Sequence, residues 1–167
     1  MNLLKILVVY FTRTGNTKFV AEKIANHLGA DICEVVDKKS RKGKIGFIKS
    51  GYESIRKKLT EIEVTKRVDD YNIVIIGSPV WAKGITPAIR TFIHQNDLSN
   101  KQIACFVTLK GDNPKKPLEK MKEAISPNIS AAELGITNDV KNRKEAEKQI
   151  TDWCNVVKNS FGIKDKV

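Results

Sequence analysis

The chain has 167 residues, of which 41% are hydrophobic and 29% charged, and 30 basic side chains against 19 acidic ones give it a net charge of +11. This length is enough for a sizeable core, and we expect one domain over residues 1–167. No apolar run approaches the roughly 18 residues of a membrane span, and the first residues lack the pattern of a signal peptide, so a cytoplasmic protein is predicted.

The cysteines and the distribution of positive charge argue against two further classes of protein. Cys33, Cys105 and Cys154 stand singly in apolar patterns, which favours small buried side chains over a disulfide framework or a zinc site. Residues 38–58 hold nine basic residues and one acid, so they carry +8 of the +11. Aromatic residues for base stacking are nearly absent there. A solvated surface is therefore favoured over a nucleic-acid site, with a weak attraction to an acidic partner or anionic ligand as the functional alternative.

Apolar runs and amphipathic helical patterns alternate along the chain. In chain order they predict a strand (3–10), a helix (16–28), a strand (31–36), a basic loop (37–46), a helix (47–60), a strand (73–76), a helix (86–97), a strand (102–108), a short helix (117–125), a weak strand near 129–134 and a last helix (about 141–159). Thr86 and Pro87 suit the N-cap and first position of their helix. Five strands with intervening helices predict an α/β fold, a doubly wound parallel sheet of order 2-1-3-4-5 with helices on both faces.

The loop after the first strand has the composition of an anion pocket. The sequence Thr12-Arg13-Thr14-Gly15-Asn16-Thr17 follows an apolar run and leads directly into a helix. The first N–H groups of a helix have no partner within it, and the helix dipole favours negative charge there. The threonines and the asparagine add side-chain donors, and the glycine lets the backbone come close. Neither GxxxxGK[ST] nor GxGxxG is present, so this predicted phosphate site is of another type.

Two more loops should meet this one at the carboxyl edge of the sheet. Residues 77–86 include Trp81, which lies outside any helical stripe and can cover the face of a planar ligand; packing against the following helix is the alternative. Residues 108–117 contain Gly111, which permits a tight turn with exposed amides, and no aromatic residue. A phosphate loop beside a loop for a flat ring predicts a site for flavin mononucleotide (FMN).

The residues of these loops resemble the flavodoxin family. The resemblance rests on Val8 to Thr17, on Gly77 to Trp81 and on the helical segment Thr86 to Ile93, and it covers nearly the whole chain. It implies non-covalent FMN binding, with the phosphate surrounded by Thr12, Arg13, Thr14, Gly15, Asn16 and Thr17. It places beside the isoalloxazine Ser78, Pro79, Val80, Trp81, Ala82, Lys83 and Gly84, with Trp81 as the stacking candidate. Residues 108–112 would close the other side and offer amides to the pyrimidine edge, among them Thr108, Leu109, Lys110 and Gly111.

Proteins of this family shuttle one or two electrons, and the flavin does the chemistry. The resemblance therefore implies electron transfer with a redox partner protein, which the basic charge would allow to be acidic, or with a small-molecule acceptor. No catalytic side chain, metal site, specific nucleic-acid contact or membrane span is expected. Receiver domains share the strand order but need an aspartate where Gly77 stands, and low-molecular-weight phosphatases need a cysteine in the first loop.

Two features separate this chain from electron carriers that are acidic around the flavin. The first is a basic rim, made of Arg13, Lys83, Lys110, Lys115 and Lys116 against the single acid Asp112. Such a rim stabilises anionic reduced flavin and predicts a higher potential for the second reduction step. The second is the missing aromatic residue in the third loop, which would leave one flavin face open to a small substrate, as in NAD(P)H-dependent flavin reductases. A domain that keeps the fold but binds little or no FMN is the third possibility.

Overall fold

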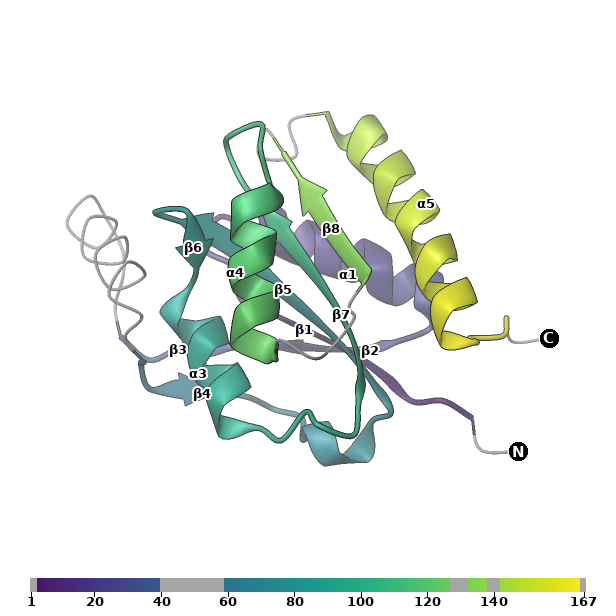
Figure 1. The fold of residues 1–167 in the computed structure, drawn as a ribbon, viewed down its shortest axis with the longest axis horizontal. Helices are drawn as coiled ribbons and strands as arrows, with labels where there is room; N and C mark the ends of the chain where they lie inside the picture. Colours follow the sequence, from purple (N-terminus) through teal and green to yellow (C-terminus); the bar gives the residue numbers. More distant parts are fainter. Residues whose placement is uncertain (1–2, 40–58, 127–131, 138–141, 166–167) are drawn as a thin grey trace.

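A twisted, mostly parallel sheet forms the centre of the molecule (Figure 1). The computed structural model describes residues 3–39, 59–126, 132–137 and 142–165. The parallel strands lie in the order β2-β1-β5-β7-β8, with these bounds: β1 (Ile6–Tyr10), β2 (Asp31–Glu34), β5 (Ile73–Trp81), β7 (Gln102–Thr108) and β8 (Ala132–Ile136). In chain order these five strands are 2-1-3-4-5, so the predicted α/β doubly wound fold is confirmed.

Smaller elements extend this framework. A short strand, β6 (Gly84–Ile85), folds back antiparallel onto the end of β5. Beside the sheet, β3 (Val36–Asp37) and β4 (Ile62–Glu63) form a separate antiparallel pair, and a 3-10 turn, η1 (Val68–Asp70), precedes β5. The hairpin of β5 and β6 matters for function, because it places its turn at the carboxyl edge of the sheet.

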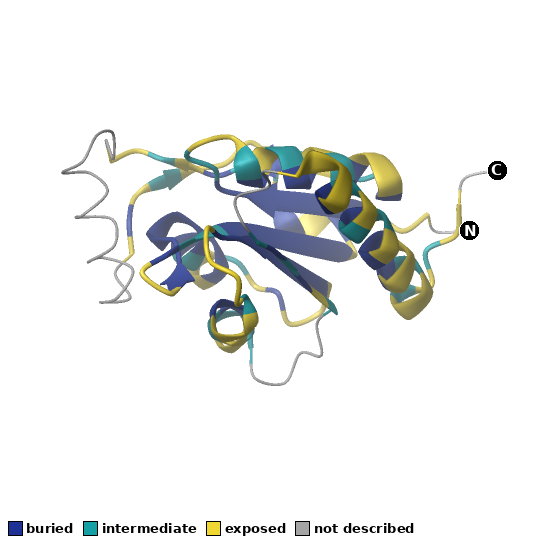
Figure 2. Ribbon diagram, turned by 90° about the horizontal axis from the view of Figure 1, so that it is seen from above, coloured by how far each residue is buried: buried dark blue, intermediate teal, exposed yellow. Residues whose placement is uncertain are grey.

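Helices cover the sheet on both faces. One face carries α1 (Asn16–Leu28) and α5 (Arg143–Phe161), and the other carries α3 (Pro87–Gln95) and α4 (Lys115–Ile125) (Figure 1). Successive strand residues point to opposite faces, so the interior divides into two apolar clusters. Val8, Ile75 and Phe106 pack with α1 and α5, whereas Val9, Ile76 and Cys105 pack with α3 and α4. Figure 2 shows the buried strands as a layer between helices that are exposed on their outer sides.

Most of the predicted elements are present. The bounds of α1 and β7 are those expected, and Thr86 caps α3, whose first residue is Pro87, by accepting a hydrogen bond from the N–H of Ile89 at 3.5 Å. The strand predicted over 31–36 breaks after Glu34, α4 begins two residues before the predicted start at 117, and β8 lies later than 129–134. Residues 47–58 of the helix predicted over 47–60 lie outside the described residues, as does most of the basic window 38–58, and Leu59 and Thr60 are not helical.

The prediction that a loop begins at residue 77 was wrong. β5 continues to Trp81, and Gly77, Ser78 and Pro79 pair with β7. On its other side β5 pairs with β1 only as far as Gly77. Pro79, which has no N–H to donate, therefore lies where β5 has become an edge strand, the position in a sheet that tolerates proline.

The described cysteines behave as buried apolar side chains. All three are free and buried, and burial raises the pKa of the Cys105 and Cys154 thiols to about 12. Both thiols therefore stay protonated at neutral pH, which suits a packing role. Within the described ranges, no helix has both the length and the hydropathy needed to cross a bilayer.

Candidate functional site

A cavity of about 910 Å³ opens at the carboxyl ends of β1, β5 and β7. Three segments far apart in the sequence form its wall. The carboxyl ends of the strands are where ligands bind in open α/β sheets. The lining residues are Arg13, Thr14, Asn16 and Thr17, then Pro79, Val80, Trp81, Ala82 and Lys83, then Thr108, Leu109, Lys110, Gly111, Asp112, Asn113, Lys116 and Pro117. Four residues assigned to the site from sequence, Thr12, Gly15, Ser78 and Gly84, are not part of this lining.

The first segment forms the start of α1 beside the cavity. Gly15 stands at the N-cap of α1 with φ of 92°, a left-handed conformation that favours glycine. The hydroxyl of Thr12 accepts the N–H of Gly15 at 3.1 Å and that of Lys18 at 3.4 Å. Within the described part of the chain, this leaves the N–H groups of Asn16 and Thr17 without an acceptor. Thr12 therefore holds the loop, and the next N–H groups are available to an anion.

A buried hydrogen bond ties the first segment to the third. The hydroxyl oxygens of Thr17 and Thr108 lie 2.8 Å apart, and the two residues are 1% and 3% exposed. Thr17 belongs to the first turn of α1, and Thr108 is the last residue of β7. This bond fixes the start of the helix to the end of a central strand.

Ser78 and Thr86 build the base of the second segment. The N–H of Thr86 donates to the hydroxyl oxygen of Ser78 at 3.1 Å, and that hydroxyl donates to the Pro79 carbonyl at 2.9 Å. Ser78 is fully buried. Its hydroxyl therefore braces the hairpin of β5 and β6 from inside the protein.

The turn of this hairpin has an unfavourable backbone. Ala82 and Lys83 join the paired residues Trp81 and Gly84 with φ of 48° and 61°, the left-handed pattern of a type I′ turn. Such turns favour asparagine and glycine, and a non-glycine residue there costs on the order of 1–3 kcal/mol.

Lys83→Gly is expected to raise the free energy of unfolding by about 1 kcal/mol, because the relief of backbone strain exceeds the entropy cost of glycine. The midpoint of urea denaturation measures this change, with an unaltered slope. Lys110→Gly, at an exposed position without positive φ, is the matched control and should gain nothing. A destabilised Lys83→Gly variant would contradict the strained turn.

Trp81 belongs to both the cavity wall and the core. It is 6% exposed, belongs to the same buried cluster as Ile85 and Ala88, and meets Phe11 edge-to-face with ring centroids 5.5 Å apart. The guanidinium carbon of Arg13 lies 5.8 Å from the indole centroid. Trp81 thus shares a core cluster with residues of the following helix α3, while its stacking on a ligand stays a prediction.

The cavity carries an excess of positive charge. Arg13, Lys83, Lys110 and Lys116 line it, against one carboxylate, Asp112. Lys83, Lys110 and Lys116 are exposed and form no ion pair with the described residues, unlike Lys23 and Lys122, which pair with carboxylates at 2.8 Å elsewhere on the surface. Lys115, the fifth predicted rim cation, is exposed but does not line the cavity. An anionic ligand or partner is therefore favoured at this mouth.

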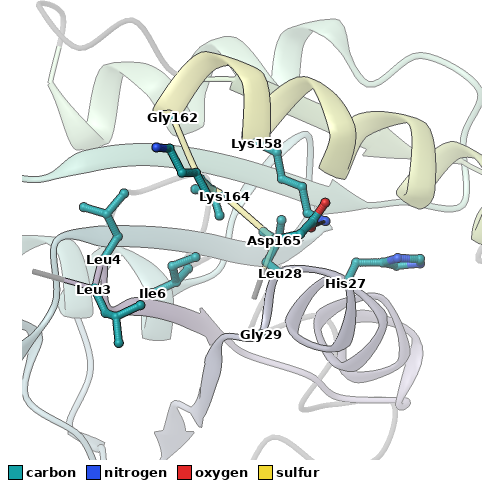
Figure 3. Close-up of a pocket in the computed structure, with 11 residues that line it drawn as sticks. Leu3, Leu4, Ile6, His27, Leu28, Gly29, Lys158, Gly162, Lys164 and Asp165 are labelled. Carbon is teal, nitrogen blue, oxygen red and sulfur yellow. Dashed lines mark hydrogen bonds and ion pairs between the residues drawn. The ribbon is translucent and has the colours of Figure 1, made fainter. Parts of the chain in front are cut away.

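A smaller cavity of about 400 Å³ lies beyond the amino end of β1, at the opposite end of the strands (Figure 3). Leu3, Leu4 and Ile6 line one side of it, and Lys158 and Asp165, on the other side, form an ion pair. None of the residues assigned to the cofactor site from sequence lines it. In the described ranges, no group of three or more metal-ligating side chains occurs there or elsewhere.

Sequence reasoning missed how the third segment is held. Asn113 and Pro117, which belong to the predicted loop 108–117 but were not assigned to the site as single residues, also line the cavity. Gly135 of β8 lies so close to the neighbouring Pro114 that a Cβ at residue 135 would come within 2.2 Å of the proline Cβ. A glycine in a strand signals a close backbone approach, but it does not reveal the partner.

The chain matches a family model described as flavodoxin over residues 5–157. A candidate flavoprotein from Bacteroides eggerthii is 26% identical, with a TM-score of 0.73 over 92% of this chain and 97% of that one. A flavoprotein from Lactobacillus acidophilus, solved in complex with FMN, is 25% identical, with a TM-score of 0.67 over 84% and 97%. An archaeal flavodoxin, 18% identical, shares the fold with a TM-score of 0.57 over 93% and 99%. A search of curated proteins gives no match.

Proposed function

The chain belongs to the flavodoxin family, and from that premise we propose that it binds FMN in the 910 Å³ cavity and transfers electrons between redox partners. The observation that carries this proposal is the start of α1. The N–H groups of Asn16 and Thr17 have no acceptor among the described residues, and both residues line the cavity, as a phosphate site requires. The Lactobacillus acidophilus flavoprotein, similar over most of its length, was solved with FMN.

The residues of this chain would hold the cofactor by its two ends. The first turn of α1, with the hydroxyls of Thr14 and Thr17, would bind the phosphate. The hairpin turn at Ala82 and Lys83 and the backbone of residues 108–111 would enclose the ring. FMN, when bound, supplies the capacity to accept and release electrons. The lining cations would stabilise the negative charge that reduction adds, and the walls would limit the access of water.

The visible spectrum of the purified protein tests this proposal. We expect the absorption bands of bound oxidised flavin, bleached by dithionite and restored by air. Protein depleted of flavin should quench the fluorescence of added FMN. A colourless protein that leaves FMN fluorescence unchanged would contradict the proposal and favour a domain that has kept the fold without the cofactor.

A second function, an NAD(P)H-dependent reductase, is favoured by one observation. The described lining residues of the third segment, Thr108 to Pro117, include no aromatic side chain, so one flavin face would be open to a small substrate. Oxidation of NADH and NADPH with a quinone acceptor distinguishes the two roles. A carrier gives no turnover above free FMN, whereas a reductase does.

The proposed partner of a carrier is an acidic redox protein, and that of a reductase is a small acceptor. The lysines at the cavity mouth, which form no ion pair with the described residues, support a partner of negative charge in either case. Free, buried cysteines suit the reducing cytoplasm, which we propose as the location.

A further inference from the structure

We propose that Thr108 is a positioning residue that orients the hydroxyl of Thr17 toward the phosphate of the cofactor. This inference rests on the proposed function, since it concerns the same cavity. Its basis is the 2.8 Å separation between the hydroxyl oxygens of two almost fully buried residues, one in α1 and one in β7, that are 91 positions apart in the sequence. Both residues border the cavity, so their contact lies at the wall of the site.

The direction of the hydrogen bond follows from counting protons. Each threonine hydroxyl has one proton to donate and two lone pairs. Apart from this contact, neither hydroxyl has another hydrogen bond within the described part of the chain. An anion at the first turn of α1 accepts hydrogen bonds only, so Thr17 must donate its proton to the anion. The Thr17 oxygen is then free to accept the proton of Thr108, and both buried hydroxyls are satisfied.

The geometry gives this arrangement its specificity. Thr108 ends β7 and is paired there with Pro79 and with Ile136, so its position is fixed by strands on both sides. A donor held by the centre of the sheet fixes the Thr17 hydroxyl before the ligand arrives, which is the usual role of a supporting hydrogen bond. Thr108 thereby links the end of β7, beside the proposed ring site, to the phosphate end.

The test compares two flavins that differ only in the phosphate. Dissociation constants for FMN and riboflavin are measured by flavin fluorescence on the wild type, Thr108→Val, Thr108→Ser and Thr17→Val. Valine keeps the shape of threonine and removes the hydroxyl. We expect Thr108→Val to weaken FMN binding about tenfold, as for the loss of one hydrogen bond between neutral groups, and to leave riboflavin binding within about twofold. Thr108→Ser should restore FMN binding.

The double variant Thr17→Val/Thr108→Val should bind FMN no more weakly than Thr17→Val alone, since the two hydroxyls act in series. Three results would each overturn the inference. These are a Thr108→Val protein that loses FMN and riboflavin binding equally, a Thr108→Val protein with unchanged FMN binding, and additive losses of FMN binding in the double variant. If Thr108→Val does not fold, Thr108→Ala takes its place, and we expect the same loss of FMN binding with little change in riboflavin binding. A wild type that binds neither flavin would instead overturn the proposed function, so the two failures are distinguishable.

Discussion

Gly77→Ala is expected to lower the free energy of unfolding by about 3 kcal/mol, a large share of the roughly 5–15 kcal/mol of a typical domain. A Cβ at residue 77 would lie 2.0 Å from Cζ of Phe106 and within 2.5 Å of both Cε atoms. Phe106 is fully buried among β1, β5, α1 and α5, so its ring has no free space to enter. Interiors packed to this density accommodate an added methyl group only by moving side chains off their rotamers.

Denaturation in urea, with the slope compared between variants, measures this change. Gly111→Ala is the matched control, because the nearest heavy atom to its added Cβ is 3.9 Å away, and its stability should stay within about 0.5 kcal/mol of the wild type. Gly77→Ala/Phe106→Leu should lose less than the sum of the two single variants, since the smaller side chain makes room. A Gly77→Ala protein as stable as the Gly111→Ala control would contradict the predicted clash, because the core would then accommodate the added methyl group.

Lys110→Glu/Lys116→Glu is expected to lower the potential of the second reduction step of bound FMN by on the order of 50 mV. Both lysines line the cavity, are exposed, and form no ion pair with the described residues. Reduction adds negative charge to the flavin, and the substitution replaces two nearby cations by two anions. The expected shift is modest because water and salt screen exposed charges, and it should shrink further at 1 M salt.

Spectroelectrochemistry of the wild type and the variant measures this shift. Lys5→Glu/Lys164→Glu makes the same change of net charge at the opposite end of the strands, where Lys164 lines the smaller cavity. It should move the potential much less. Equal shifts of the potential in the two double variants would indicate an effect of total charge. No shift in either variant would contradict an electrostatic role of the basic rim.

The fold was predictable from sequence because its signals are local. The alternation of apolar runs and helical patterns predicted the bounds of α1 and β7, and Thr86 with Pro87 indicated the start of α3. The end of β5 was missed because Gly77, Ser78 and Pro79 have low strand propensity. Pairing with β7 overrides that propensity, and local composition does not report such pairing.

The candidate site was predictable in outline for the same reason. Each loop had a recognisable composition, and the topology brought the three loops together. The roles of single residues were not predictable, because they depend on contacts between distant segments. Ser78 faces Thr86 inside the hairpin, Thr12 holds the backbone of its own loop, and Thr17 meets Thr108 across 91 positions of sequence.

The most direct measurement of the central claim is a titration of ¹⁵N-labelled protein with FMN, followed by the amide resonances in two-dimensional NMR spectra. We expect the largest shifts at Asn16 and Thr17, whose N–H groups are available to the phosphate, with further shifts in residues 80–84 and 108–113. Amides around Leu28 and Ile163, at the smaller cavity, should stay in place. Shifts centred on that smaller cavity, or none at saturating FMN, would contradict the assignment of the cofactor site.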